Sequence, residues 1–250
     1  MKPLLAVILA VALLSGCGGE SSEAATSGAV TVFAAASLTE AFTEIATAFE
    51  AAHPGAKVTF NFGPSSGLAE QIVQGAPADV FAAANTSTMD KVVAAGLSDG
   101  AAEVFVRNYL EIAVPAGNLA GISGLADFAK PDLKLALCAE QVPCGAAAKK
   151  AFAAAGVRPQ PDTLEQDVKA VLSKVSLGEV DAGIVYHTDV QAAGGRVAGI
   201  EFPEAEQAVN DYPMVVLKTA PNAAIARAFV AYVRGAEGAR VLTEAGFARP

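Results

Sequence analysis

The sequence predicts an α/β protein whose chain is divided between two lobes. Runs with strand character alternate with runs of helical period, which is the βαβ rhythm of a largely parallel sheet covered by helices. The rhythm stops at a strand that closes with Pro115 and starts again near Leu133. Such a restart favours two lobes, each a mixed sheet flanked by helices.

The first lobe is expected to contain three strand–helix units. Val, Phe and Thr favour strands, whereas apolar residues spaced three and four apart favour helices. We expect strands over 30–35, 57–62 and 79–83, helices over 38–52, 67–74 and 86–95, and a further strand over 108–115.

The second part of the chain repeats this pattern. Strands are expected over 133–137, 182–186, 197–202 and 212–218, and helices over 145–155, 167–177, 223–234 and 237–245. The two terminal helices could return to the first sheet. We therefore assign residues 29–108 and about 214–250 to the first lobe, and about 109–213 to the second.

Residues 1–17 have the character of a signal peptide rather than of a folded element. Lys2 precedes an unbroken apolar stretch, 4–14, that is too short to span a bilayer. The segment ends in Leu-Ser-Gly-Cys17, which resembles a bacterial lipobox and implies acylation of Cys17. Residues 18–28 are small and polar, as in a flexible tether. We expect a lipid-anchored, extracytoplasmic protein, with an ordinary secreted precursor as the alternative.

Composition excludes some classes of partner. The net charge of −9 argues against nucleic acid as a ligand. After residue 17 we find no stretch long and apolar enough for a transmembrane helix. A small anion would have to be held by local hydrogen-bond donors against a mildly repulsive overall field.

Four predicted helix starts carry groups that suit an anion. Ser37 stands where an N-cap belongs, and Glu40 completes the pattern of a capping box. A hydroxyl beside the free N–H groups of a helix start can bind an anion, although a structural cap alone would explain one such serine. Similar starts follow the segments Gly63-Pro64-Ser65-Ser66-Gly67, Val142-Pro143-Cys144-Gly145 and Glu165-Gln166-Asp167-Val168. The four starts could converge on one ligand without a cationic side chain.

Two cysteines remain once Cys17 is assigned to the lipobox. Cys138 and Cys144 form an even pair in a protein expected in an oxidising compartment, which favours a disulfide. Its role would be to fix the turn that presents the N–H of Cys144. A redox couple or a metal pair is the alternative, but the spacing is not Cys-x-x-Cys and a soft-metal site would need further ligands.

Five segments, taken in order, resemble a known family. VTVFAAASLTEAF, GPSSGLAEQIVQGAPADVFAAA, EQVPCG, EQDVKAVL and GIVYHTD are similar to the molybdate-binding proteins of bacterial ABC importers, over nearly all of the chain after the tether. The resemblance implies a type II periplasmic-binding-protein fold, with one tetrahedral oxyanion in the cleft between the lobes. It also implies delivery to a membrane permease, tungstate as a second ligand, no cofactor and no catalysis; we expect a monomer.

The resemblance also implies a set of ligand contacts. Ser37 and Ser65 would bind molybdate from the first lobe, with Ser66 as an additional candidate. Cys144 and Val168 would donate backbone N–H groups from the second lobe, and Tyr186 would present its phenol. The pair Cys138–Cys144 departs from the family pattern and puts the geometry of its turn in question.

The chemistry of these contacts supports a dianion independently. A fully deprotonated oxyanion needs donors only, and hydroxyls with helix-end N–H groups supply them. Phosphate near neutral pH often keeps a proton and needs an acceptor. Sulfate is the harder competitor, since cavity size is what separates it from molybdate. A sulfate or other oxyanion binder on the same fold is therefore the main alternative.

Two remote alternatives depend on the histidines. The turn Gly63–Gly67 fits the G-x-S-x-G pattern of a serine hydrolase, with His187 and Asp189 downstream. A zinc site would need His53 and His187, which stand far apart in sequence without a carboxylate–histidine cluster. We interpret His187 as a rim or structural residue, Arg107 and Lys91 as surface charges, and Tyr109 and Tyr212 as packing at the lobe junction.

Overall fold

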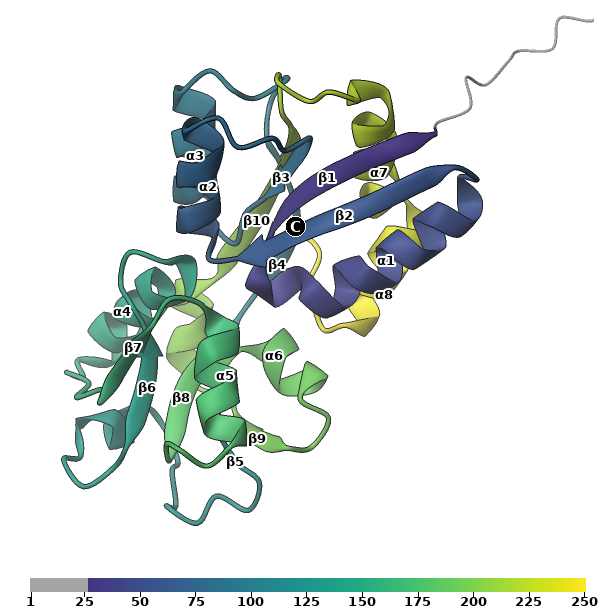
Figure 1. Ribbon diagram of the computed structural model, residues 1–250. Helices are drawn as coiled ribbons and strands as arrows, with labels where there is room; N and C mark the ends of the chain where they lie inside the picture. Colours follow the sequence, from purple (N-terminus) through teal and green to yellow (C-terminus); the bar gives the residue numbers. More distant parts are fainter. Residues whose placement is uncertain (1–26) are drawn as a thin grey trace, which may run out of the picture.

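The computed structural model describes residues 27–250, which form two bodies, each built on its own sheet (Figure 1). The signal peptide, Cys17 and residues 18–26 of the tether lie outside the described residues. No helix in the described part of the chain combines the length and apolar character needed to cross a membrane.

The first lobe contains a five-stranded sheet in the order β2-β1-β3-β10-β4. Its strands are β1 (Gly28–Ala35), β2 (Ala56–Gly63), β3 (Val80–Ala82), β4 (Glu103–Asn108) and β10 (Asn210–Val216). The strand β1 pairs in parallel with β2 and β3, whereas β10 is antiparallel to β3 and β4. Its helices are α1 (Thr39–Ala52), α2 (Ser65–Val73), α3 (Thr86–Ala94), α7 (Ala223–Arg234) and α8 (Ala236–Glu244), with a 3-10 turn η1 (Ala36–Leu38) between β1 and α1.

The second lobe repeats this plan with the order β7-β6-β8-β5-β9. Its strands are β5 (Leu110–Pro115), β6 (Leu135–Cys138), β7 (Thr163–Glu165), β8 (Ala182–Tyr186) and β9 (Val197–Ile200). Here β6 is parallel to β7 and β8, and β5 is antiparallel to β8 and β9. The helices are α4 (Pro143–Ala155), α5 (Val168–Ser176) and α6 (His187–Ala192), with 3-10 turns η2 (Leu125–Ala129) and η3 (Pro203–Ala208).

Each lobe has its own apolar core. In the first lobe, Phe49 meets Phe229 edge to face at 5.4 Å between ring centroids, which fixes α1 against α7. In the second, Phe128 packs on Phe152 at 5.3 Å. Separate cores let the lobes hold their shape while the joint between them carries polar groups.

The chain crosses between the sheets at two places close together in space. Asn108 ends β4 and Leu110 begins β5, so the predicted strand 108–115 is divided by the first crossing. The chain rejoins the first sheet at Asn210, somewhat before position 214. The sequence pattern does not indicate the start of β10, because the strand begins with two polar residues, Asn210 and Asp211. Its pairing with β4 also shifts register at Tyr212/Pro213. Both crossings place polar residues beside the cleft.

Candidate oxyanion site

A small cavity lies between the lobes where several helices begin. Its lining joins the first-lobe segments Ala35–Ser37, Gly63–Ser65 and Ala84 to the second-lobe segments Val142–Cys144, Gln166–Val168 and Tyr186. The volume is about 20 Å³, which suits one small species rather than an organic ligand. The structure thus brings Ser37, Ser65, Cys144, Val168 and Tyr186 together; Ser66 is buried nearby and is not among the lining residues.

Ser37 does not cap a helix, so the predicted capping box is wrong. The residue lies inside the 3-10 turn η1, and neither η1 nor α1 has a side-chain cap. Its Oγ lies 2.8 Å from the hydroxyl of Tyr212, while Glu40 bonds Lys169. The extra 3-10 turn moves the start of α1 past Ser37, and this rotates the hydroxyl toward the cavity.

Ser65 is the first residue of α2 and follows Pro64. Its Oγ accepts a hydrogen bond of 3.0 Å from the backbone N–H of Ala84, in the loop after β3. The bond holds the hydroxyl between two segments of the first lobe. The serine is buried and lines the cavity, so its hydroxyl hydrogen can point into the cavity.

The second lobe contributes two helix starts. Val168 begins α5, whose N-cap Asp167 accepts from the N–H of Ala170 at 3.0 Å. Cys144 stands in the first turn of α4, which begins at Pro143, two residues earlier than the predicted helix start at 145. The N–H groups of a first turn have no acceptor within their own helix. Both N-termini therefore present free donors and the positive end of a helix dipole to the cavity.

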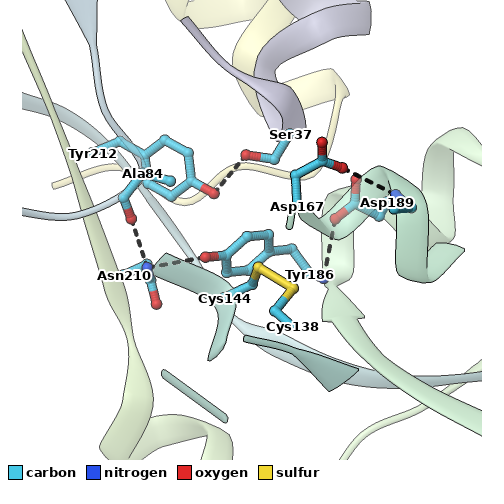
Figure 2. The surroundings of a disulfide bond; sticks show 10 residues. Ser37, Ala84, Cys138, Cys144, Asp167, Tyr186, Asp189, Asn210 and Tyr212 are labelled. Atoms are coloured by element: carbon cyan, nitrogen blue, oxygen red, sulfur yellow. Dashed lines mark hydrogen bonds between the residues drawn. A yellow bond between two sulfur atoms is a disulfide. The ribbon is translucent and has the colours of Figure 1, made fainter. Parts of the chain in front are cut away.

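A disulfide holds the α4 start. Cys138, the last residue of β6, is bonded to Cys144, with the two Cα atoms 5.8 Å apart (Figure 2). Gly145 follows, and a Cβ there would lie 2.0 Å from the carbonyl oxygen of Ala139. A side chain at this position would push the first turn of α4 away from the sheet, so glycine and the disulfide together fix where the Cys144 N–H points.

Tyr186 ends β8 with its ring buried at the lobe junction. Its hydroxyl accepts a 3.0 Å hydrogen bond from Nδ2 of Asn210, a first-lobe residue (Figure 2). Its ring meets that of Tyr212 edge to face at 6.0 Å. Burial raises the pKa of Tyr186 well above its usual value, so the phenol stays protonated and remains a donor.

No lysine or arginine is among the residues that line the cavity. Lys169 follows the lining residue Val168 on α5, and its Nζ lies 2.7 Å from Glu40 across the lobe junction and 3.1 Å from Asp189. Burial lowers the pKa of Lys169, but Asp189 and Glu40 raise it above its usual value. Burial raises the pKa of Asp189 to about 6, while Lys169 acts in the opposite direction. An anion would thus be held by hydrogen bonds and helix dipoles.

The hydrogen bonds of three polar residues at this junction were not predicted from the sequence. Asn108 and Asn210 are buried and bond across the crossing strands, and Tyr212, which we interpreted as packing, also contacts Ser37. They come from β4 and β10, far from the helix starts in sequence. Only the pairing of β10 with β3 and β4 brings them to the site, and no local pattern signals it.

The histidines do not form the alternative sites. His187 Nδ1 lies 2.9 Å from Glu111 on β5, and Asp189 bonds the N–H of Tyr186, so neither serves Ser65 as a triad partner. His53 stacks on Phe49 in the first lobe. Within residues 27–250 no three His, Cys, Asp or Glu side chains are grouped as metal ligands would be.

Comparison with known proteins gives the family. A family model described as "Bacterial extracellular solute-binding protein" matches residues 30–248. The molybdate-binding protein ModA of Mycobacterium tuberculosis is 43% identical over 246 residues, covering 96% of this chain and 94% of that protein. ModA of Escherichia coli is 34% identical over 88% of this chain and 89% of that protein. The chain belongs to the ModA family of bacterial extracellular solute-binding proteins. The predicted family is thereby confirmed.

Solved structures confirm the predicted fold of this ModA-family chain. The periplasmic molybdate-binding protein of Azotobacter vinelandii superposes with a TM-score of 0.76 at 22% identity, covering 88% of this chain and 99% of that one. The sulfate-binding protein SubI of Mycobacterium tuberculosis gives a TM-score of 0.75 at 18% identity, covering 88% of this chain and 86% of that one. The superpositions establish the shared two-lobed architecture. At identities this low they do not establish the ligand.

Proposed function

We propose that the protein binds molybdate, and also tungstate, as the extracytoplasmic binding subunit of an ABC importer. The observation that carries the proposal is the small cavity between the lobes, lined by hydroxyls and helix N-termini without a lysine or arginine. The identity of 43% to a protein named for molybdate binding supports the choice of ligand. Capture would involve no chemical step, since the oxyanion is bound and released unchanged.

Five groups would hold the oxyanion. Ser37 and Ser65 donate their hydroxyls from the first lobe. The N–H groups of Cys144 and Val168 and the phenol of Tyr186 donate from the second. An ion that bonds both lobes binds the closed arrangement more tightly than an open one, so it shifts the protein toward closure. The closed form would then deliver the ion to a permease.

A sulfate binder is the second candidate, because sulfate is also a tetrahedral dianion that only accepts hydrogen bonds. The observation that supports this candidate is the set of hydrogen-bond donors, which any tetrahedral dianion could satisfy. Molybdate and tungstate are larger than sulfate, so size decides between them. The ligand preference is therefore the property to measure first.

Isothermal titration calorimetry of the purified protein tests the function. Molybdate and tungstate should bind more tightly than sulfate, and phosphate should give little or no heat. Tighter binding of sulfate than of molybdate would favour the second candidate, and tighter binding of phosphate would end both assignments. Turnover of an ester substrate that is lost in His187→Ala would instead support hydrolysis.

We also propose that the mature protein is a monomer anchored by acyl chains on Cys17. Mass spectrometry of the protein from the native membrane fraction should show acylation at Cys17. A Cys17→Ser variant should appear in the soluble fraction with its anion binding intact. An unmodified Cys17 in the mature protein would contradict the anchor without affecting the assignment of the ligand.

A further inference from the structure

The three hydroxyls at the cavity already bond other groups of the protein, and the direction of each bond decides whether the hydroxyl hydrogen is used in it. Ser65 Oγ accepts from the N–H of Ala84, and a backbone N–H can only donate. The Ser65 hydroxyl therefore uses an oxygen lone pair for the protein and keeps its one hydrogen for the cavity. The other two hydroxyls, on Tyr186 and Ser37, also bond neighbouring polar groups.

The hydrogen bond between Asn210 and Tyr186 has a fixed direction. Asn210 Nδ2 lies 2.6 Å from the carbonyl oxygen of Ala84, which can only accept, so the amide nitrogen faces Ala84 (Figure 2). Its second hydrogen is directed to the hydroxyl of Tyr186 at 3.0 Å. Both amide hydrogens are then in use and the phenol oxygen is the acceptor. The bond to Asn210 thus uses a lone pair of the Tyr186 oxygen and does not need the phenol hydrogen.

A similar relay ends at Ser37. Asn108 Oδ1 accepts from the N–H of Tyr109 at 3.0 Å, so its Nδ2 is the donor to Thr188 and, at 3.4 Å, to the hydroxyl of Tyr212. Burial raises the pKa of Tyr212, so its hydroxyl stays protonated. Because Asn108 donates to the Tyr212 oxygen, we assign the 2.8 Å bond between Tyr212 and Ser37 to donation by the phenol, which leaves the hydrogen of Ser37 for the cavity.

We propose that Asn210 and the Asn108–Tyr212 pair are positioning residues that fix the direction of the hydroxyl hydrogens toward the oxyanion. The inference deepens the proposed function and rests on it. Ser37, Ser65 and Tyr186 then act only as donors, in line with the backbone N–H groups of Cys144 and Val168. A fully deprotonated tetrahedral dianion satisfies all of them.

This arrangement disfavours an oxyanion that carries a proton. Hydrogenphosphate must donate one hydrogen bond, and each of the three hydroxyls already uses an oxygen lone pair for a bond within the protein. Asp167 is the one carboxylate among the lining residues, and it accepts the α5 cap bond from Ala170. Selection against protonated oxyanions therefore depends on residues that do not themselves touch the ligand.

A double-mutant cycle between Asn210 and Tyr186 tests the inference in the full mature protein. Molybdate affinity is measured by calorimetry for Asn210→Ala, Tyr186→Phe, the double variant and the parent. If Asn210 acts through the phenol hydrogen, Asn210→Ala should weaken binding about tenfold in the parent and almost not at all beside Tyr186→Phe. A merely structural role would give the same loss in both backgrounds and would overturn the inference.

Two controls keep the result interpretable. Asn61→Ala removes a half-buried asparagine on β2 whose amide bonds Gln71 in the first lobe, and it should leave affinity unchanged. Tyr212→Phe and Ser37→Ala form a second double-mutant cycle, on the Asn108–Tyr212–Ser37 contacts. This cycle tests the inference if Asn210→Ala does not fold. Loss from Tyr212→Phe should likewise disappear when Ser37 is already alanine, and additive losses would contradict the relay.

The anion preference gives an independent measurement. Near pH 6, where phosphate carries a proton, Asn210→Ala should lower the ratio of molybdate to phosphate affinity, whereas Asn61→Ala should not; an unchanged ratio would contradict the inference. If the parent binds sulfate rather than molybdate, the proposed function fails, and the same cycles measured with sulfate still decide the direction of the hydrogens.

Discussion

The two lobes supply the same kind of hydrogen bond by different means. The first lobe presents side-chain hydroxyls, Ser37 and Ser65, each oriented by a neighbouring polar group. The second presents the N-termini of α4 and α5 and one phenol. A hydroxyl can be removed by one substitution. A backbone N–H depends on the geometry of its turn and not on the side chain, so the donors of the second lobe can be a cysteine and a valine.

The supports differ accordingly. In the first lobe Ser37 is held by Tyr212, a residue far away in sequence. In the second lobe the two helix starts have local supports, namely the Cys138–Cys144 disulfide, the close approach of Gly145 to Ala139, and the cap of α5 by Asp167, whereas the Tyr186 phenol depends on Asn210 of the first lobe. We therefore expect point substitutions to remove the three hydroxyl donors directly, and changes of turn geometry to impair the two backbone donors of the second lobe.

The largest effect is expected from Tyr186→Phe, the one side-chain donor of the second lobe. Loss of one hydrogen bond to a charged ligand costs roughly 1.5–3 kcal/mol, so molybdate affinity should fall roughly ten- to a hundredfold. Because Asn210 also loses its acceptor, the empty protein should be destabilised by about 1 kcal/mol. Calorimetry and thermal unfolding measure the two effects; unchanged affinity would remove Tyr186 from the site.

The next effect concerns the first lobe. Ser37→Ala and Ser65→Ala should each weaken molybdate binding about tenfold, since each removes one donor hydroxyl. Ser37→Ala should also lower the free energy of unfolding by about 1 kcal/mol, through the lost bond to Tyr212 rather than through a lost helix cap. Val168→Ala is the matched control in the second lobe and should change affinity little. A large loss in that control would show that its side chain matters.

Opening the disulfide should have a smaller effect on binding. The double variant Cys138→Ser/Cys144→Ser frees the start of α4 and should lower stability by about 2 kcal/mol, as the loop-entropy model gives for so short a loop. Affinity should fall severalfold because the Cys144 N–H is less well fixed. Chemical denaturation and calorimetry, compared with the reduced parent, provide the test. Full affinity in the variant would show that Gly145 and the helix fix the turn unaided.

The smallest effect concerns pH and stability. Asp189 has a pKa of about 6 in the folded protein, against 3.8 as its usual value, so the folded state holds its proton more tightly than the unfolded state. Its favourable contribution is present below about pH 4 and is lost as the pH rises through about 6. The melting temperature of the parent should therefore decline over this range relative to Asp189→Asn. Parallel curves for the two proteins would contradict the raised pKa.

Much of the fold and of the candidate site can be predicted from the sequence, and the parts that cannot have physical reasons. The helix starts at Ser65, Cys144 and Val168 follow from local turn patterns, and the structure places them at one cavity. Ser37 lies at the cavity but does not have the predicted capping role, because the chain makes a 3-10 turn over Ala36–Leu38 before α1 begins. Asn210 and Tyr212 reach the site through strand pairing between distant segments, which local patterns do not encode.

The most direct test of the central claim is a crystal structure of the protein grown with molybdate, with the metal located by its anomalous scattering. The account predicts one molybdenum peak in the cavity between the lobes. Its oxygens should lie within hydrogen-bonding distance of the hydroxyls of Ser37, Ser65 and Tyr186 and of the N–H groups of Cys144 and Val168. A peak at another place, or an oxyanion bonded to only one lobe, would contradict the account.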